Sequence, residues 1–239
     1  MGGLSVCVKL MHCYAQGGAR SMRRKFEEQT MDRKLIAIGG ALSLAVLIAG
    51  TGIAIMAGRQ GDQFAECGGG AVAGSAIGGP FELVNAAGQT VTDADIITGP
   101  TILYFGYTFC PDVCPLDNAR NALAVDILEE NGIDVTPVFI SIDPDRDTPE
   151  VVGDYAYNFH DRMIGLTGSP EQVAAASRAY KTYYQKEADG DPEYYLVSHS
   201  TFSYLALPGY GVVDFFKRED SAEAVAERTA CFAAAAGAS

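Results

Sequence analysis

The chain has 239 residues, which is long enough for one large domain or two small ones. It contains 17 basic and 30 acidic residues; ten of the basic and 27 of the acidic residues follow residue 57, so this part has a net charge of −17. Nucleic acid is therefore excluded as a partner, because a polyanion is bound by basic surfaces.

The first predicted element is an uncharged apolar segment of 23 residues, 35–57. A helix of about 20 apolar residues crosses a bilayer, whereas a cleavable signal has an apolar core of about 7–15 residues. No convincing A-x-A site follows, so we expect an uncleaved transmembrane anchor. Seven of the 17 basic residues precede it, which predicts a cytoplasmic tail, 1–34, and an exported remainder, in a bacterium in the periplasm.

The tail contains Cys7, His12 and Cys13, whose spacing resembles a metal site. These residues lie on the predicted cytoplasmic side. Met22 and Met31 are alternative translation starts, so residues 1–30 need not be translated at all. Because isolated Cys and His spacing carries little information, we assign no site to the tail.

Residues 58–80 are rich in Gly and small residues, which predicts a flexible tether, and residues 81–239 are predicted to form the folded domain. A first strand is expected at 80–85, and residues 86–92 are a turn into a second strand. Further strands are expected at 99–107, 135–143, 163–169, 194–208 and 211–218. Helices are expected at 115–131, from the TPE and SPE sequences at 148 and 169, and at 221–236. This alternation, ending in a hairpin and a helix, predicts an α/β thioredoxin-like fold.

The helix at 115–131 is predicted from apolar residues spaced by three or four, a pattern typical of a helix. They are Leu116, Ala119, Leu123 and Ile127.

The sequence YFGYTFCPDVCP places Cys110 and Cys114 between a buried strand and this helix. Open α/β sheets have their sites at the carboxyl ends of strands, and amides at a helix N-terminus favour thiolates. Asp112 and Asp117 oppose that effect, so we expect less acidification than in a strongly activated redox thiol.

Three residues separate the two cysteines, one more than in a common redox pair. Residues four apart on a helix have Cβ atoms about 5–6 Å apart, whereas a disulfide needs about 3.5–4.5 Å. Two thiolates at about 2.3 Å from one metal ion tolerate the wider separation. The spacing therefore favours a chelate without forbidding a disulfide, and two soft thiolates select Cu(I), Zn or an iron–sulfur cluster.

A third ligand would have to come from one of the three histidines. His12 lies across the predicted membrane, and His160 is expected to be a surface residue at a helix end. His199 follows Cys114 by 85 residues, in a strand with aromatic flanks. A histidine near a strand is usually structural, so on spacing alone both interpretations of His199 stay open.

Three sequences, YFGYTFCPDVCP, FISIDPDRDTPE and YYLVSHSTFSYL, occur in this order behind one predicted anchor. Through them, residues 78–235 resemble the Sco/SenC family of copper chaperones for cytochrome c oxidase assembly. The resemblance implies a thioredoxin-like fold and a copper ion that is held by Cys110, Cys114 and His199. The ion is expected to be Cu(I), and binding of Cu(II) is left open. It also implies two partners, a copper donor protein and cytochrome c oxidase subunit II with its dinuclear copper site.

One position departs from the family, because Ser198 stands where an Asp commonly precedes the histidine. A carboxylate there would orient the imidazole or engage a partner. Weaker copper affinity and substitution by a nearby acid such as Asp143 both remain open. Otherwise residues 141–149 are interpreted as a structural connection.

Cys67 and Cys231 both lie in the predicted exported part, where a disulfide persists. A Cys67–Cys231 disulfide that pins the tether to the domain is one hypothesis, since spacing does not determine connectivity.

Three functions fit this sequence. The first is a copper metallochaperone, which binds a metal and is not an enzyme. The second is a thiol–disulfide oxidoreductase in which Cys110 and Cys114 reduce the cysteines of the oxidase site. The third is a redox sensor on the same fold. His199 distinguishes the first two, because a dithiol reductase needs no third ligand.

Overall fold

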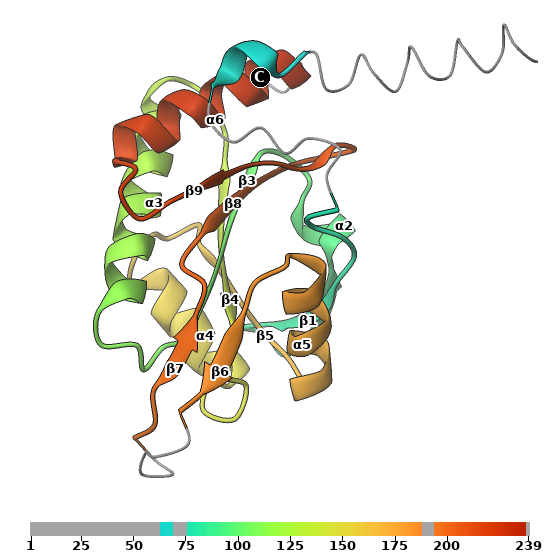
Figure 1. Cartoon of the computed structure of the whole chain (residues 1–239), viewed down its shortest axis with the longest axis vertical. Coiled ribbons are helices and arrows are strands. Elements are labelled where there is room, and N and C mark those ends of the chain that lie inside the picture. Colours follow the sequence, from blue (N-terminus) through green and yellow to red (C-terminus); the bar gives the residue numbers. More distant parts are fainter. Residues whose placement is uncertain (1–62, 69–75, 188–193, 238–239) are drawn as a thin grey trace, which may run out of the picture. The chain divides into compact units, whose positions relative to one another are not determined.

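The strands of a seven-stranded mixed sheet form the centre of the structure (Figure 1). In chain order they are β1 (Glu82–Asn85), β2 (Thr90–Thr92), β3 (Thr101–Gly106), β4 (Thr136–Ser141), β5 (Ile164–Thr167), β8 (Ser203–Leu207) and β9 (Gly211–Phe216). Across the sheet their order is β2-β1-β5-β4-β3-β8-β9. The β3–β4 and β4–β5 pairs are parallel and the others antiparallel. The predicted α/β thioredoxin-like fold is confirmed.

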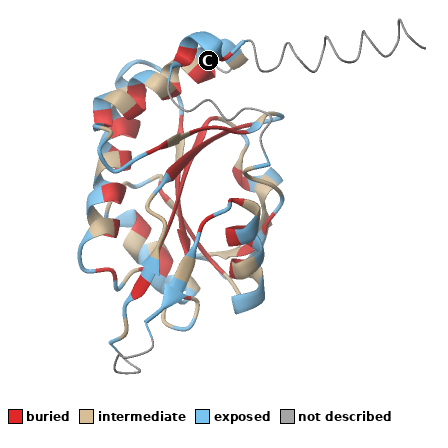
Figure 2. Ribbon diagram, in the orientation of Figure 1, coloured by how far each residue is buried: buried red, intermediate tan, exposed pale blue. Residues whose placement is uncertain are grey.

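The helices lie outside this sheet. They are η1 (Ala65–Cys67), α2 (Asp93–Ile96), α3 (Val113–Glu130), α4 (Pro149–Tyr157), α5 (Pro170–Ala179) and α6 (Ala222–Ala236). Figure 1 shows α3 and α4 on one side of the sheet and α5 on the other. Buried residues gather in the central strands and on the inward faces of the helices (Figure 2). Strand β3, at the centre of the sheet, is buried along its whole length.

The computed structural model describes residues 63–68, 76–187 and 194–237, and these all belong to the unit Arg59–Ser239. The predicted tail and anchor, 1–57, lie outside the described residues, and so do Cys7, His12 and Cys13. Within the described ranges, no helix has the length and apolar character needed to cross a membrane.

The helix starts follow local sequence rules. Thr148 and Ser169 accept hydrogen bonds from backbone amides of the first turn, and a proline follows each of them at the first helical position. Ser221 caps α6 in the same way, through the amide of Ala224. The prediction of these three helices is confirmed.

The predicted helix is confirmed as α3, but the apolar residues whose spacing predicted it do not lie on its buried side. Leu116 and Leu123 are 60% and 50% exposed. The buried side contains other apolar residues, such as Val125 and Leu128. It also contains three nearly fully buried polar residues, Asp117, Asn118 and Asn121. Asp117 and Asn121 are hydrogen-bonded to side chains of the sheet, and Asn118 is hydrogen-bonded to the Cys114 carbonyl of its own helix, so these buried polar groups are satisfied.

The prediction of one strand over 194–208 is wrong. In the structure this stretch contains two strands, β7 (Val197–His199) and β8. Only β8 belongs to the main sheet; β7 pairs antiparallel with β6 (Tyr184–Lys186), a strand that the sequence pattern did not reveal. His199 therefore lies at the end of a separate two-stranded hairpin, opposite Tyr184.

The predicted flexible tether contains packed residues. Phe64 is fully buried, and its ring lies 5.2 Å from that of Phe232 and 5.3 Å from that of Tyr210. A disulfide joins Cys67 to Cys231 of α6, with Cα atoms 5.4 Å apart, which confirms that hypothesis. In the described range 63–68, Phe64 and Cys67 therefore belong to the core, because aromatic burial and a covalent bond outweigh the local preference of small residues for coil.

Candidate metal centre

The loop that carries Cys110 is held by a buried aspartate. Strand β3 ends at Gly106 and α3 begins at Val113, so the loop connects the two. Asp147, fully buried, accepts hydrogen bonds from the amide (3.0 Å) and hydroxyl (2.6 Å) of Thr108 and from the hydroxyl of Ser141 (2.6 Å). The segment 141–149 thus has the structural role interpreted from the sequence, and it fixes the loop two residues before Cys110.

Cys110 and Cys114 lie on opposite sides of the start of α3. Cys110 is just outside the helix and Cys114 is in its first turn, where its amide donates a hydrogen bond to the Sγ of Cys110 over 3.3 Å. Both are free thiols, and both are buried. This is the arrangement that the spacing of three residues predicted.

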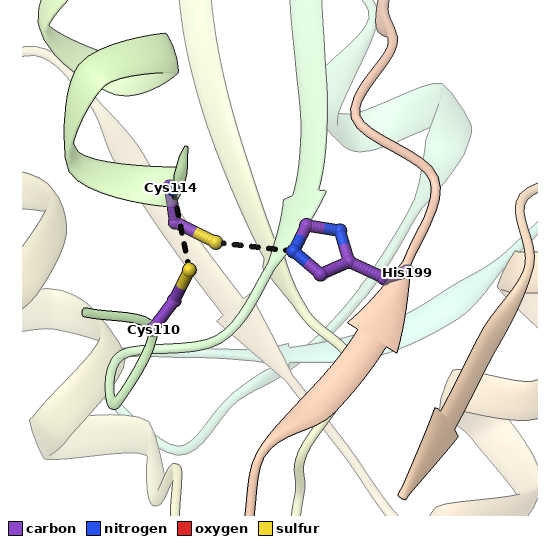
Figure 3. A group of neighbouring side chains, drawn as sticks. All are labelled: Cys110, Cys114 and His199. Atoms are coloured by element: carbon purple, nitrogen blue, oxygen red, sulfur yellow. Dashed lines mark hydrogen bonds between the residues drawn. The ribbon is translucent and has the colours of Figure 1, made fainter. Parts of the chain in front are cut away.

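His199 reaches the pair from the end of β7 (Figure 3). Its Nε2 lies 3.3 Å from the Sγ of Cys114, and its Nδ1 lies 2.7 Å from the carbonyl oxygen of Ser200. A carbonyl can only accept, so Nδ1 carries the proton and Nε2 presents its lone pair to the sulfurs. The three donor atoms all lie within 4.8 Å of one another.

This donor set fits a soft metal ion. Two sulfurs and one imidazole nitrogen, with no carboxylate among the three, are the ligands that Cu(I) prefers in proteins. The hydrogen bond from Nδ1 to a backbone carbonyl is the usual way in which a metal-binding histidine is held in the correct tautomer. The tyrosine rings of Tyr104 and Tyr107 pack edge-on against the imidazole and further limit its rotation.

The two thiols have different acidities. The hydrogen bond from Cys114 lowers the pKa of Cys110, and backbone amides of Asp112 and Cys114 act in the same direction. The pKa of Cys114 is raised, first by its hydrogen bond to Cys110 and then by burial. The pKa of Cys110 is thus lowered overall, whatever opposition the carboxylates of Asp112 and Asp117 supply, so Cys110 is more acidic than the sequence suggested.

The different acidities predict different reactivities in the metal-free, reduced protein. Alkylation of Cys110 by iodoacetamide should change little between pH 5 and 8, because its lowered pKa keeps the thiolate present throughout that range. An ordinary thiol, with a pKa of about 8.5, would react roughly tenfold faster with each pH unit over the same range. Pulsed labelling and mass spectrometry of the two cysteines would measure this. A tenfold rise per pH unit at Cys110 would contradict it.

Below Cys114 lies a buried polar group that the sequence analysis did not identify. Tyr104, fully buried in β3, donates a hydrogen bond to the carboxylate of Asp117 over 3.1 Å. Burial raises the pKa of Asp117, and the guanidinium groups of Arg120 and Arg218 oppose that rise. The available signal was the placement of Asp117, Asn118 and Asn121 at helical spacing from Cys114, which puts polar residues on the same face as the cysteine.

A second set of contacts attaches the β6–β7 hairpin to the loop after β4. Tyr195 donates a hydrogen bond to Asp143 over 2.5 Å, and the ammonium group of Lys186 pairs with Asp145. The guanidinium of Arg146 lies 3.7 Å from the centre of the Tyr195 ring and 4.7 Å from that of Phe109. Arg146 therefore packs between the segment that carries His199 and the segment that carries Cys110.

These contacts also bear on the position before His199. The carboxylate of Asp143 is bound by Tyr195, Arg146 and Lys186. The acid that reaches Ser198 is Glu187, whose carboxylate accepts a hydrogen bond from the serine hydroxyl over 3.2 Å. A negative charge is thus present beside the histidine, on the neighbouring chain segment.

The expectation that His160 is a surface residue is wrong, since its side chain is only 8% exposed. Its Nδ1 accepts a hydrogen bond from the amide of Arg162 over 3.1 Å, so the proton lies on Nε2, which faces Asp126 at 3.3 Å. The possible ligand atoms of His160, Asp126 and Glu129 lie within 4.8 Å of one another, as they would around a metal ion. However, the Nε2 that faces the carboxylates carries the proton, so it donates a hydrogen bond and has no lone pair for a metal. His160 therefore has a structural role.

A model of the family described as SCO1/SenC matches residues 70–234. The chain belongs to the SCO1/SenC family. Its SCO1/SenC relatives include Protein SenC of Rhodobacter capsulatus, which is 47% identical over 200 residues that make up 83% of this chain and 90% of the relative.

Solved structures of SCO1/SenC relatives have the same fold. The crystal structure of Arabidopsis thaliana ScoI with copper bound is 42% identical, with a TM-score of 0.61 over 65% of this chain and 98% of that one. The crystal structure of yeast Sco1 with copper bound is 34% identical, with a TM-score of 0.61 over 64% of this chain and 86% of that one.

Proposed function

We propose that this chain is a copper metallochaperone that delivers copper to the dinuclear site of cytochrome c oxidase subunit II. The sulfurs of Cys110 and Cys114 and the Nε2 of His199 hold the ion. The observation that carries this proposal is the convergence of these three donors, from segments 85 residues apart, within 4.8 Å. Two copper-bound structures among the relatives support copper as the ion.

The number of ligands suits transfer. Three protein ligands leave Cu(I) accessible to a further thiolate or imidazole from an incoming protein, so the ion can move by exchange of one ligand at a time. In this proposal residues 35–57 anchor the chain, the domain lies on the exported side, and a separate copper protein loads it.

A thiol–disulfide reductase is the second candidate, favoured by the lowered pKa of Cys110. The Cys110 thiolate would attack a disulfide in the oxidase subunit, releasing one of its thiolates and forming a mixed disulfide. Cys114, after losing its proton, would then attack Cys110, which forms the Cys110–Cys114 disulfide and releases the second thiolate. Two electrons pass to the subunit, whose cysteines become free to bind copper.

Replacement of His199 by alanine distinguishes the two candidates. His199→Ala should lower copper affinity by about 10–100-fold or more, because the ion loses a direct ligand. Disulfide exchange should remain largely intact, since neither sulfur is altered. Titration of the full-length chain in detergent with copper, followed by absorption and by competition with a chelator, would measure the first effect, and exchange with a model disulfide the second.

The matched control is His160→Gln, which changes the other described histidine and should leave copper affinity unchanged. Unaltered copper affinity in His199→Ala would contradict the site, whereas loss of disulfide exchange in that variant would favour the reductase. One-to-one stoichiometry in the unmodified chain is required by the proposal.

A further inference from the structure

Large apolar side chains are exposed beside the copper-binding residues. We call residues 107–116 and 194–203 the rim; these 20 residues contain Cys110, Cys114 and His199. Five of the nine large apolar side chains that are exposed in the described part of the chain belong to the rim. They are Phe109, Leu116, Tyr194, Leu196 and Phe202. Scattered exposed apolar residues need no explanation, but a concentration of them at one site indicates an interaction surface.

The rim also lacks charge. It has one charged residue, Asp112, although 20% of the residues in the chain are charged. The surrounding domain is strongly acidic. The basic residue of the β6–β7 hairpin, Lys186, already forms an ion pair with Asp145 in the loop after β4. The copper-binding residues therefore lie on uncharged, largely apolar segments of a domain that repels negative partners. The charged residues that border these segments are Glu187, which is bound to Ser198, and Arg146, which packs on Phe109.

The donor atoms lie below the protein surface, and this limits how a partner protein can reach them. Cys114 is fully buried and Cys110 is 6% exposed, so a ligand that is part of another protein can reach the ion only when that protein lies directly against the rim, whereas a small free chelator needs no such contact. A lipid surface would cover the same apolar side chains but offers no ligand for copper. A second copy of this chain would bring a second acidic domain, whose charge opposes association.

We propose that the rim is the docking surface for the copper acceptor, and that the acceptor presents an uncharged, apolar surface around its own copper ligands. This inference rests on the proposed function and adds the chemistry of the partner. Contact between two uncharged apolar surfaces is insensitive to salt, unlike encounters that are steered by charge.

The test uses the full-length chain in detergent, loaded with Cu(I), and two acceptors. One is the metal-free copper domain of cytochrome c oxidase subunit II from the same organism, and the other is the small chelator bathocuproine disulfonate. The double variant Phe109→Ser and Phe202→Ser should slow transfer to the protein at least about tenfold, because a central interface side chain contributes more than 1 kcal/mol. Transfer to the chelator should not change, since it needs no rim.

Tyr157→Ser is the matched control, because Tyr157 is also exposed but ends α4 outside the rim; its transfer rates should equal those of the unmodified chain. Raising the salt concentration from 50 to 500 mM should change the rate of protein transfer by less than about twofold.

Each other outcome has a definite meaning. If the unmodified chain transfers no copper to the subunit, both the proposed function and the rim are overturned. Equal transfer rates in the double variant and the unmodified chain would overturn the rim alone, even if that variant lost binding to lipid vesicles or self-association. If the double variant also transferred copper more slowly to the chelator, the two side chains would belong to the copper site itself. If the rate of transfer to the subunit fell steeply as the salt concentration rose, docking would depend on charge. Either result contradicts the proposal.

Discussion

Replacement of Cys110 or Cys114 by serine should abolish tight copper binding. Each substitution removes one of the two soft donors and substitutes a hydroxyl, which is a poor ligand for Cu(I). Because loss of a group that only orients a ligand costs about 10–100-fold in affinity, loss of a thiolate itself should cost more than about 100-fold. Competition with a Cu(I) chelator at pH 7 would measure the affinity of each variant against the unmodified chain.

The structure offers a matched control within the same centre. Ser198 lies next to His199, and its hydroxyl is bound to Glu187 and not directed at the cysteines. Ser198→Ala should therefore keep copper affinity within about threefold of the original. Tight binding in either cysteine variant would show that the ion is held elsewhere and would remove the basis of the proposed function.

Removal of the Cys67–Cys231 disulfide should greatly lower the free energy of unfolding of the folded domain. The bond closes a loop of 164 residues, and the chain-entropy model gives about 5 kcal/mol for a loop of that length, with about 2–5 kcal/mol typical for native disulfides. The double variant Cys67→Ser and Cys231→Ser should therefore unfold at a clearly lower denaturant concentration. Urea unfolding of the folded domain within the full-length chain, followed by circular dichroism, would measure the change.

The same variant should still bind copper at low temperature. The disulfide lies at α6, whereas Cys114 lies at the opposite end of α3, a helix of 18 residues and hence about 27 Å long. Cys67→Ser alone serves as the comparison, because loss of either sulfur breaks the bond, and its stability should match that of the double variant. A loss below about 1 kcal/mol in both would mean that burial of Phe64 is sufficient to hold the segment.

The parts of the fold that were predicted correctly depend on neighbouring residues. Thr148, Ser169 and Ser221 each cap a helix because a hydroxyl reaches amides two or three residues further on. The central strands are recognisable because burial on both faces demands continuous apolar runs such as Thr101–Gly106. Such rules act over a few residues and need no knowledge of the rest of the chain.

The orientation of α3 shows where these rules stop. The spacing of Leu116 and Leu123 predicted the helix correctly, but both side chains are exposed. The buried side combines apolar residues such as Val125 with Asp117 and Asn121. The two polar side chains are hydrogen-bonded to Tyr104 and Ser203, which lie on two different strands. A pattern of hydrophobic residues does not contain that information, since the partners are 13 and 82 residues away.

The sequence by itself determined the strand-to-helix position of Cys110 and Cys114, the separation of their sulfurs and the choice of a soft metal. Those properties follow from residues within one turn of helix. Only the tertiary structure decided that His199 directs Nε2 at the cysteines, that Cys67 pairs with Cys231, and that apolar side chains of α3 are left at the surface. Each of these depends on segments far apart in the chain, whose approach is set by packing and by buried hydrogen bonds that the whole fold must satisfy together.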